Sequence, residues 1–314
     1  MCGLIVSRGV AGSHIDDNGI CNYHTAQLIL CHPPPIPPMD LTLILKALLM
    51  GIVEGLTEFL PISSTGHLII IGDLIKFEQS IGSKTIADTF EIFIQLGAIL
   101  AVIVYFLRDL IDLLRRAPTD RKAQRLLLSV AVAFIPAAII GILLDKLIEQ
   151  YLFSPFTVGI AMVTGGVIIL AVERWFSSHT PTVKSLEDVD PKRGLGIGIA
   201  QIASLFPGMS RSASTIVGGL LVDLDRPTAL RFSFYLSIPT MVAATLYKLV
   251  KQLGNIHGNQ VLAFVVGLVV SFIVAYLVIR WFLGYIAQHD LKPFAWYRLA
   301  LGALMIALYI PLPH

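Results

Sequence analysis

The chain is poor in charged residues. Asp, Glu, Lys and Arg make up only 14% of its 314 residues, whereas 55% are hydrophobic, and the mean hydropathy is +0.78. A soluble domain carries roughly a quarter charged residues, so this composition excludes a soluble globular protein and indicates an integral membrane protein. The formal net charge is only +2, and no basic run is interleaved with aromatic residues. A nucleic-acid-binding protein is therefore excluded as well.

Cysteine is also scarce, and familiar cofactor motifs are missing. The three cysteines, Cys2, Cys21 and Cys31, all precede residue 39, and their spacing matches no familiar zinc pattern. The sequence has no Walker loop, no Rossmann glycine fingerprint and no His-Glu-x-x-His motif. Residues 1–38 contain no apolar run of signal-peptide length and end in a proline-rich stretch. We interpret them as a disordered or non-native extension without an assigned function.

Long apolar segments dominate the rest of the chain. Six are long enough, at about 17–25 residues, to cross a bilayer: 89–107, 126–144, 156–173, 229–249, 261–282 and 294–312. Two further apolar regions, 41–75 and 194–222, are interrupted by polar strings. Residues 194–206 are too few to span, so we interpret both regions as re-entrant helical hairpins, which need protein or water to cover their open backbone. Residues 41–60 alone could span, but an internal repeat argues against this.

The repeat has an offset of 147 residues. Gly51–Phe59 aligns with Gly198–Phe206, and the same offset superimposes Ser63 on Ser210 and Thr65 on Ser212. Three spans follow each hairpin, and because three is odd the second unit must be inverted relative to the first. The sequence therefore predicts an all-α polytopic membrane protein with six transmembrane helices and two re-entrant helical hairpins in an inverted-topology repeat. Its parts are a first repeat, a cytoplasmic linker and a second repeat, at 39–173, 174–193 and 194–314.

Loop charges predict the orientation. The 108–125 and 174–193 loops carry six and four Lys or Arg residues, whereas the 145–155 and 250–260 loops carry one each. The positive-inside rule assigns the first two loops to the cytoplasm. The first hairpin then enters from outside and the second from the cytoplasm.

The first polar string runs from Glu54 to His67. Glu54 and Glu58 are four residues apart and share one face of a helix. Two such carboxylates in low dielectric need a divalent cation, a cationic residue or a shared proton between them. Mg²⁺ or Ca²⁺, completed by substrate phosphate oxygens, fits this pattern, and the alternative is a structural pair bonded to backbone and to Arg211.

Hydroxyls and an imidazole follow these carboxylates. Ser63, Ser64 and Thr65 can cap a helix that starts after Pro61, and they can also bind phosphate. His67 is one turn further along, where a neutral imidazole could take a hydroxyl proton or donate one to a leaving group. We favour catalysis over simple hydrogen bonding because of the nearby glutamates.

The second polar string contains Arg211 directly after Pro207-Gly208-Met209-Ser210. Its guanidinium matches phosphate oxygens two at a time, and Ser210, Ser212 and Thr215 would add further donors to a phosphate. The inverted repeat requires Glu58 and Arg211 to meet in a common chamber near the midplane. The two strings together predict a phosphate site within the membrane.

With both strings identified, the chain resembles the undecaprenyl-diphosphatase family, also called bacitracin-resistance proteins, over about residues 39–314. The resemblance implies hydrolysis of undecaprenyl diphosphate, a polyprenyl diphosphate lipid, to the monophosphate and inorganic phosphate. This recycles the lipid carrier for peptidoglycan synthesis and opposes bacitracin. It also implies a bacterial inner-membrane location, a site reached from the outer (periplasmic) face, and functional roles carried over by motif to Glu54, Glu58, Ser64, His67 and Arg211.

The sequence leaves several alternatives open. Ser64 either attacks the terminal phosphorus or positions a water that does, with His67 or Glu58 handling protons. A prenyl-phosphate flippase or an anion transporter is the competing class, because inverted repeats with broken helices are also a transporter plan. The metal identity, the prenyl length and the oligomeric state, a homodimer included, are not specified.

Overall fold

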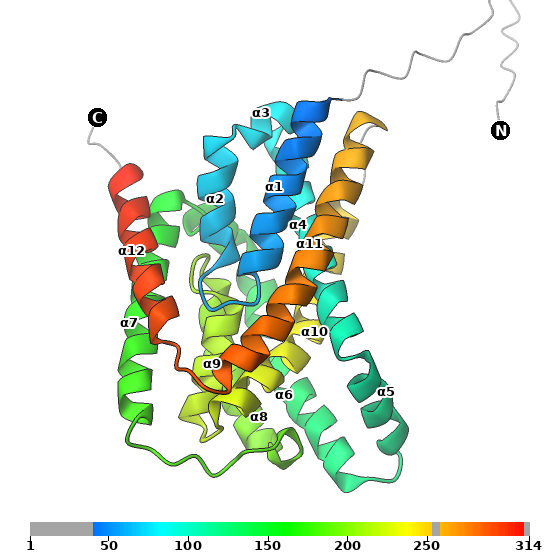
Figure 1. Ribbon diagram of the computed structural model, residues 1–314, viewed down its shortest axis with the longest axis vertical. Helices are drawn as coiled ribbons and strands as arrows, with labels where there is room; N and C mark the ends of the chain where they lie inside the picture. The colour runs from blue at the N-terminus through cyan, green and yellow to red at the C-terminus, as the bar shows by residue number, and fades with distance from the viewer. Residues whose placement is uncertain (1–39, 253–257, 311–314) are drawn as a thin grey trace, which may run out of the picture. The chain divides into compact units, whose positions relative to one another are not determined.

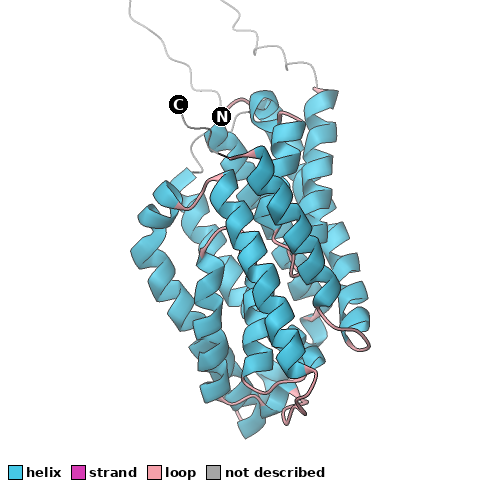
Figure 2. Cartoon of the chain, turned by 90° about the vertical axis from the view of Figure 1, so that its left-hand side faces the viewer, coloured by secondary structure: helices cyan, strands magenta, loops and turns pink. Residues whose placement is uncertain are grey.

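Helices form almost all of the regular structure. The computed structural model describes residues 40–252 and 258–310, so the prediction of a disordered extension at 1–38 lies outside the described residues. Within these ranges there is no strand, only one isolated bridge between Val183 and Leu224 (Figure 2). The all-α prediction is confirmed for this part of the chain.

Five helices are long and apolar enough to cross a membrane. They are α4 (Lys84–Tyr105), α6 (Arg121–Tyr151), α7 (Pro155–Phe176), α10 (Arg226–Gln252) and α11 (Gly258–Ile286). They coincide with five of the six predicted spans and confirm a multi-pass membrane protein. The sixth predicted span, 294–312, is covered by α12 (Lys292–Leu308), a helix of 17 residues. The crossing number of six remains a prediction.

The two interrupted regions form pairs of shorter helices. The first contains α1 (Leu41–Thr57) and α2 (Ser64–Leu74), and the second contains α8 (Pro191–Gln201), η2 (Ile202–Leu205) and α9 (Arg211–Leu221). Helices α2 and α9 have 11 residues each. Such a helix is about 16 Å long, only half of a hydrocarbon core of about 30 Å. Neither helix is long enough to cross the membrane, and both begin at turns in the interior of the bundle (Figure 1).

The same unusual turn precedes α2 and α9. Ser63 and Ser210 both have positive φ, at 70° and 68°, and each side chain accepts a hydrogen bond from the backbone N–H three residues later. A serine rarely adopts this left-handed region. Its recurrence at two positions 147 residues apart supports the repeat deduced from the sequence.

Each hairpin packs against the other half of the chain. Helix α1 lies along α11, and α8 lies along α6 (Figure 1). A Cβ on Gly51 would lie 2.6 Å from the carbonyl oxygen of Gly267, and one on its repeat counterpart Gly198 would lie 2.4 Å from that of Ala133. Small residues allow such close backbone approach between membrane helices.

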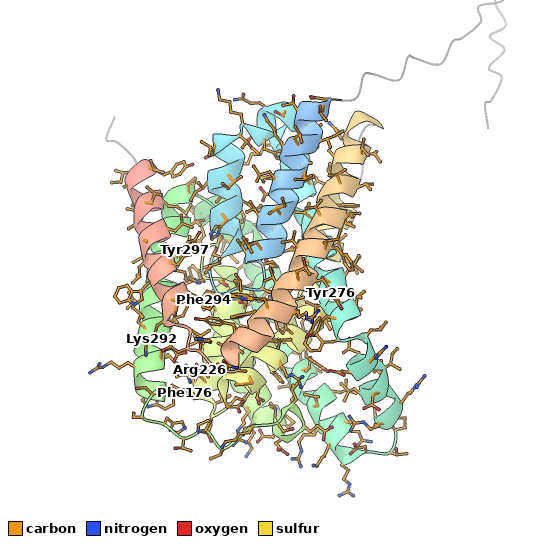
Figure 3. The ribbon with its side chains drawn as sticks, viewed as in Figure 1. Phe176, Arg226, Tyr276, Lys292, Phe294 and Tyr297 are labelled. Atoms are coloured by element: carbon orange, nitrogen blue, oxygen red, sulfur yellow. The ribbon has the colours of Figure 1, made fainter. Side chains whose placement is uncertain are left out.

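The basic loops gather at one end of the bundle. The first loop contains most of α5 (Leu107–Arg116) and the second contains η1 (Leu186–Asp188). Arg116 Nη1 donates to Glu187 Oε1 at 2.9 Å and so joins the two loops. Nearby, hydrogen bonds from the Thr182 hydroxyl and the His179 ring lower the pKa of the Asp223 carboxyl. At this end, Arg226 also pairs with the buried Glu173 (Arg226 is labelled in Figure 3). The 108–125 and 174–193 loops thus lie on one side, as their charges predict.

The hairpins begin at opposite ends. Ser129 Oγ donates to Val189 O at 2.9 Å, which holds the start of α8 at the basic end. Helix α1 begins beside α3 (Phe77–Ile81), where Lys46 Nζ donates to Ser80 Oγ at 2.6 Å. Gln260 Nε2 bonds to Ile81 O at 2.8 Å and brings the start of α11 to this second end.

Candidate functional site

The centre of the site is the carboxylate of Glu58, at the point where α1 ends. Its Oε2 accepts a hydrogen bond from Ser64 Oγ at 2.6 Å, and its Oε1 accepts one from Arg211 Nη2 at 3.4 Å. The first contact is within one hairpin, and the second joins the two hairpins. The expected contact between Glu58 and Arg211 is therefore present, whereas a common chamber near the midplane stays a prediction. Both side chains are largely shielded, at 7% and 10% exposed.

Arg211 opens α9 and is held from two sides. Its Nη1 donates to Ser233 O on α10 at 3.4 Å, and its guanidinium carbon lies 5.5 Å from the ring centroid of Phe59. The Nε atom is buried without a hydrogen-bond partner. An arginine normally uses its donors when it is buried. Part of this guanidinium is therefore available to a ligand oxygen.

Glu54 lies one turn before Glu58 and is 1% exposed. Its Oε1 has no hydrogen-bond partner, and neither does the buried Ser212 Oγ. Buried polar atoms without partners are rare in native interiors, and each calls for an explanation such as an ion or water. Orphaned atoms from both hairpins fit a site that binds a polar ligand.

Glu54 also lines a cavity of about 280 Å³, whereas Glu58, Arg211 and Ser212 are not among its lining residues. Glu54, Ser64 and Thr65 line it from the first hairpin, and Asp88, Glu91 and Gln95 line it from α4. Other lining residues include Lys84 at the start of α4, and Asp145 and Tyr247 near the ends of α6 and α10. The cavity therefore leads toward the end of the bundle opposite to the basic loops.

The donor set suits a hard divalent cation only in part. Carboxylate oxygens are the ligands that Mg²⁺ and Ca²⁺ prefer, and Glu54 Oε1 is the carboxylate oxygen left without a partner. Both oxygens of Glu58 already accept hydrogen bonds. Among the described residues, no group of three or more His, Cys, Asp or Glu side chains is arranged around a metal position. The residues fit a cation whose other ligands are phosphate oxygens and water.

Both ring nitrogens of His67 contact residues other than Ser64. Its Nδ1 lies 2.7 Å from Ser63 O, and its Nε2 lies 2.8 Å from the hydroxyl of Tyr297 on α12. A carbonyl only accepts, so Nδ1 carries the proton and Nε2 accepts from Tyr297. The rings stack at 5.5 Å between centroids (Tyr297 is labelled in Figure 3). The catalytic role of His67 stays a prediction.

The predicted phosphate-binding hydroxyls occupy different positions. Ser63 and Ser210 serve as helix N-caps, and Thr65 lines the cavity. Thr215 is 1% exposed, and its Oγ1 lies 2.6 Å from Ser233 Oγ. Ser212 is buried beside Arg211 in the chain. Phosphate contacts by these five residues stay predictions.

Sequence reasoning missed Tyr297 and Arg298. Tyr297 bonds to His67, and Arg298 reaches the backbone of both hairpin turns. Both lie in the predicted span 294–312, where Arg298 is the only charged residue. An arginine within an apolar span is itself a signal of function, and it could have identified this position.

Fold and site together define a class: a multi-pass helical membrane protein with a buried polar site between two broken helical hairpins. Within this class, the chain belongs to the family described as Bacitracin resistance protein BacA, whose match covers residues 47–304. The family resemblance deduced from the two polar strings is thus confirmed.

Curated relatives cover nearly the same region. A protein of Thermoanaerobacter sp. strain X514, named undecaprenyl-diphosphatase, is 50% identical over 85% of this chain and 97% of its own length. A protein of the same name from Caldanaerobacter subterraneus subsp. tengcongensis is 49% identical over 86% of this chain and 97% of its own length. Another from Albidiferax ferrireducens is 45% identical over 86% and 96%, respectively.

Proposed function

We propose that this protein is a membrane phosphatase that hydrolyses undecaprenyl diphosphate to undecaprenyl phosphate and inorganic phosphate. This activity recycles the lipid carrier for peptidoglycan synthesis and confers resistance to bacitracin. The observation that carries the proposal is the contact chain Ser64–Glu58–Arg211, which joins a nucleophile, a base and a phosphate-binding cation across the two hairpins. The shared name of the relatives supports the substrate.

Proton transfer is assigned to Glu58. Its Oε2 is 2.6 Å from Ser64 Oγ, within reach for a general base. In one route the Ser64 oxygen bonds to the terminal phosphorus, the bond from that phosphorus to the bridging oxygen breaks, and undecaprenyl phosphate leaves. Water then cleaves the phosphoserine. In the other route Ser64 and Glu58 orient a water that attacks directly, and His67 is the second proposed proton carrier.

Several groups can stabilise the negative charge that develops on the phosphoryl oxygens in the transition state. Arg211 offers its unpaired Nε–H, and the N-termini of α2 and α9 contribute backbone N–H groups with a favourable dipole. Thr65, Ser63, Ser210, Ser212 and Thr215 are the proposed hydroxyl contacts. A bound Mg²⁺ or Ca²⁺, held by Glu54 with Glu58 beside it, would neutralise phosphate oxygens as a Lewis acid.

The proposed topology is six spans and two re-entrant hairpins in an inverted repeat, at 39–173 and 194–314, joined by the cytoplasmic linker 174–193. The opposite entry of the hairpins and the gathering of the basic loops support it. Because the cavity leads away from these loops, the substrate would enter from the outer face of the inner membrane. Labelling of a Glu78→Cys variant with a membrane-impermeant thiol reagent in intact cells tests this orientation. We expect labelling without permeabilisation, and a cysteine that reacts only after permeabilisation would contradict it.

A prenyl-phosphate flippase or an anion transporter is the second candidate, favoured by the hairpins that start at opposite ends. One assay separates the two. Purified protein in detergent, given a prenyl diphosphate with Mg²⁺ or Ca²⁺, releases phosphate if it is an enzyme. Folded protein that releases none across varied metals and pH, yet moves the lipid between vesicle leaflets, would support the transporter instead.

A further inference from the structure

Arg298 is a fully buried arginine in the middle of α12. A guanidinium has five N–H donors, and the five hydrogen bonds here all end on backbone carbonyl oxygens, at 2.9–3.4 Å. The acceptors are Pro61, Gly208, Met209, Ala161 and Met162. The side chain therefore uses its full donor capacity on the main chain.

These acceptors come from three separate parts of the bundle. Pro61 belongs to the turn between α1 and α2, and Gly208 and Met209 belong to the turn before α9. The other two acceptors lie on α7. Irregular backbone at membrane depth must find internal partners for its carbonyls. One side chain meets this need for both turns and attaches them to the same helix.

The helices around the Arg298 side chain are closely packed. Helices α7 and α12 approach closely, since a Cβ on Gly302 would lie 2.8 Å from the carbonyl oxygen of Gly159. A Cβ on Gly165 would lie 2.1 Å from Arg298 Nη2, so that glycine leaves the space the guanidinium occupies. The turns are thus fastened to a rigid helix pair.

Both fastened turns lead directly into the site. Pro61 precedes Ser64 by three residues, and Met209 precedes Arg211 by two. The relative position of the Ser64 hydroxyl and the Arg211 guanidinium therefore depends on how the two turns are held. Such alignment matters because a displacement of about 1 Å can cost about 100-fold in rate.

We propose that Arg298 is a positioning residue: it fixes both hairpin turns to the α7–α12 pair so that Ser64 and Arg211 face the same phosphate group. Arg298 acts through the turns and does not touch the substrate. The kinetic part of this proposal rests on the phosphatase function proposed above, whereas its structural part does not.

The test compares three variants of the full chain with the wild type. Arg298→Lys keeps the charge but loses the fork of donors, and Gly165→Ala crowds the guanidinium without altering it. Gly166→Ala is the matched control, because its Cβ would meet Ala295 O at 3.0 Å and the Leu299 side chain at 3.1 Å on the same helix pair, away from Arg298. Monodisperse protein in detergent is measured by hydrogen-exchange mass spectrometry and by hydrolysis of a short-chain prenyl diphosphate.

We expect faster amide exchange in 59–66 and 206–213 for Arg298→Lys and Gly165→Ala, and a kcat lowered by about tenfold or more in the folded fraction. The control should remain within about threefold of the wild type. Unchanged exchange in both turns would overturn the proposal, and so would loosening spread equally over α7 and α12 with unchanged kcat. A wild type without hydrolysis would refute the proposed function, and the exchange data would still decide the role of Arg298.

Discussion

Glu54 is the proposed metal ligand with an unpaired buried oxygen. It is almost completely buried, and one carboxylate oxygen has no partner. Its counterpart in the second repeat is Gln201, which is equally buried and also has an orphaned atom, Nε2. The fold therefore accepts an amide at this position in one half, which suggests that the carboxylate in the other half serves chemistry and not folding.

Replacing Glu54 by glutamine should leave folding intact and remove activity. We expect Glu54→Gln to lower metal-dependent phosphate release by about 100-fold or more, because a neutral amide binds a divalent cation poorly. The thermal unfolding temperature in detergent should not fall, since the buried charge is removed. Glu78→Gln, an exposed residue of α3, is the control. Near-normal turnover by Glu54→Gln would exclude Glu54 as a ligand.

Substitution of Ser64 distinguishes the two chemical routes. If Ser64 is the nucleophile, Ser64→Ala should lose nearly all turnover, and the wild type should show an acid-stable phosphoserine after rapid quenching. Ser64→Cys tests whether a thiol can take over the attack on phosphorus. Full turnover by Ser64→Ala would remove Ser64 as nucleophile and leave water attack assisted by Glu58.

Individual site residues could be predicted from the sequence where charged residues stood at a regular spacing within an apolar segment. Glu58 and Arg211 could be paired because intramembrane charges are costly unless compensated. Tyr297 could not be predicted as the partner of His67, since an aromatic near a span end is usually interfacial. The orientation of His67 depends on the path of α12, which no local pattern specifies.

Among the secondary-structure elements, the equivalence of the turns before α2 and α9 was the most predictable feature. The 147-residue offset anticipated that Ser63 and Ser210 would be equivalent, and both are positive-φ caps of 11-residue helices. The packing partners could not be foreseen. Gly51 and Gly198 aligned in sequence, but only the structure shows that they contact α11 and α6.

Helix contacts at these glycines should be sensitive to a single methyl group. Gly198→Ala would place a Cβ 2.4 Å from Ala133 O, and we expect a destabilisation of about 1–3 kcal/mol from overpacking. Gly284→Ala in α11 is the control, since no atom lies within 4 Å of its Cβ, and better helix propensity should make it neutral or slightly stabilising. Unfolding curves in detergent measure both, and equal stabilities would contradict the packing account.

Across the whole molecule, the charged residues of the candidate site are distributed asymmetrically. The two repeats share their turns and glycine contacts, but the paired carboxylates are confined to the first half and the site arginine to the second. The cavity follows this asymmetry, because it is lined from the first hairpin and leads to one end. This one-sided arrangement favours the proposed hydrolysis over passage of a lipid or an anion through the membrane.

The central claim is that the two hairpins together form a metal-assisted phosphatase site. Its most direct measurement is phosphate release from a prenyl diphosphate by purified protein, before and after chelation and after Mg²⁺ or Ca²⁺ is restored. We predict turnover that disappears with the chelator, returns with the metal and is abolished in Arg211→Ala. Folded wild-type protein that releases no phosphate under any of these conditions would contradict the account.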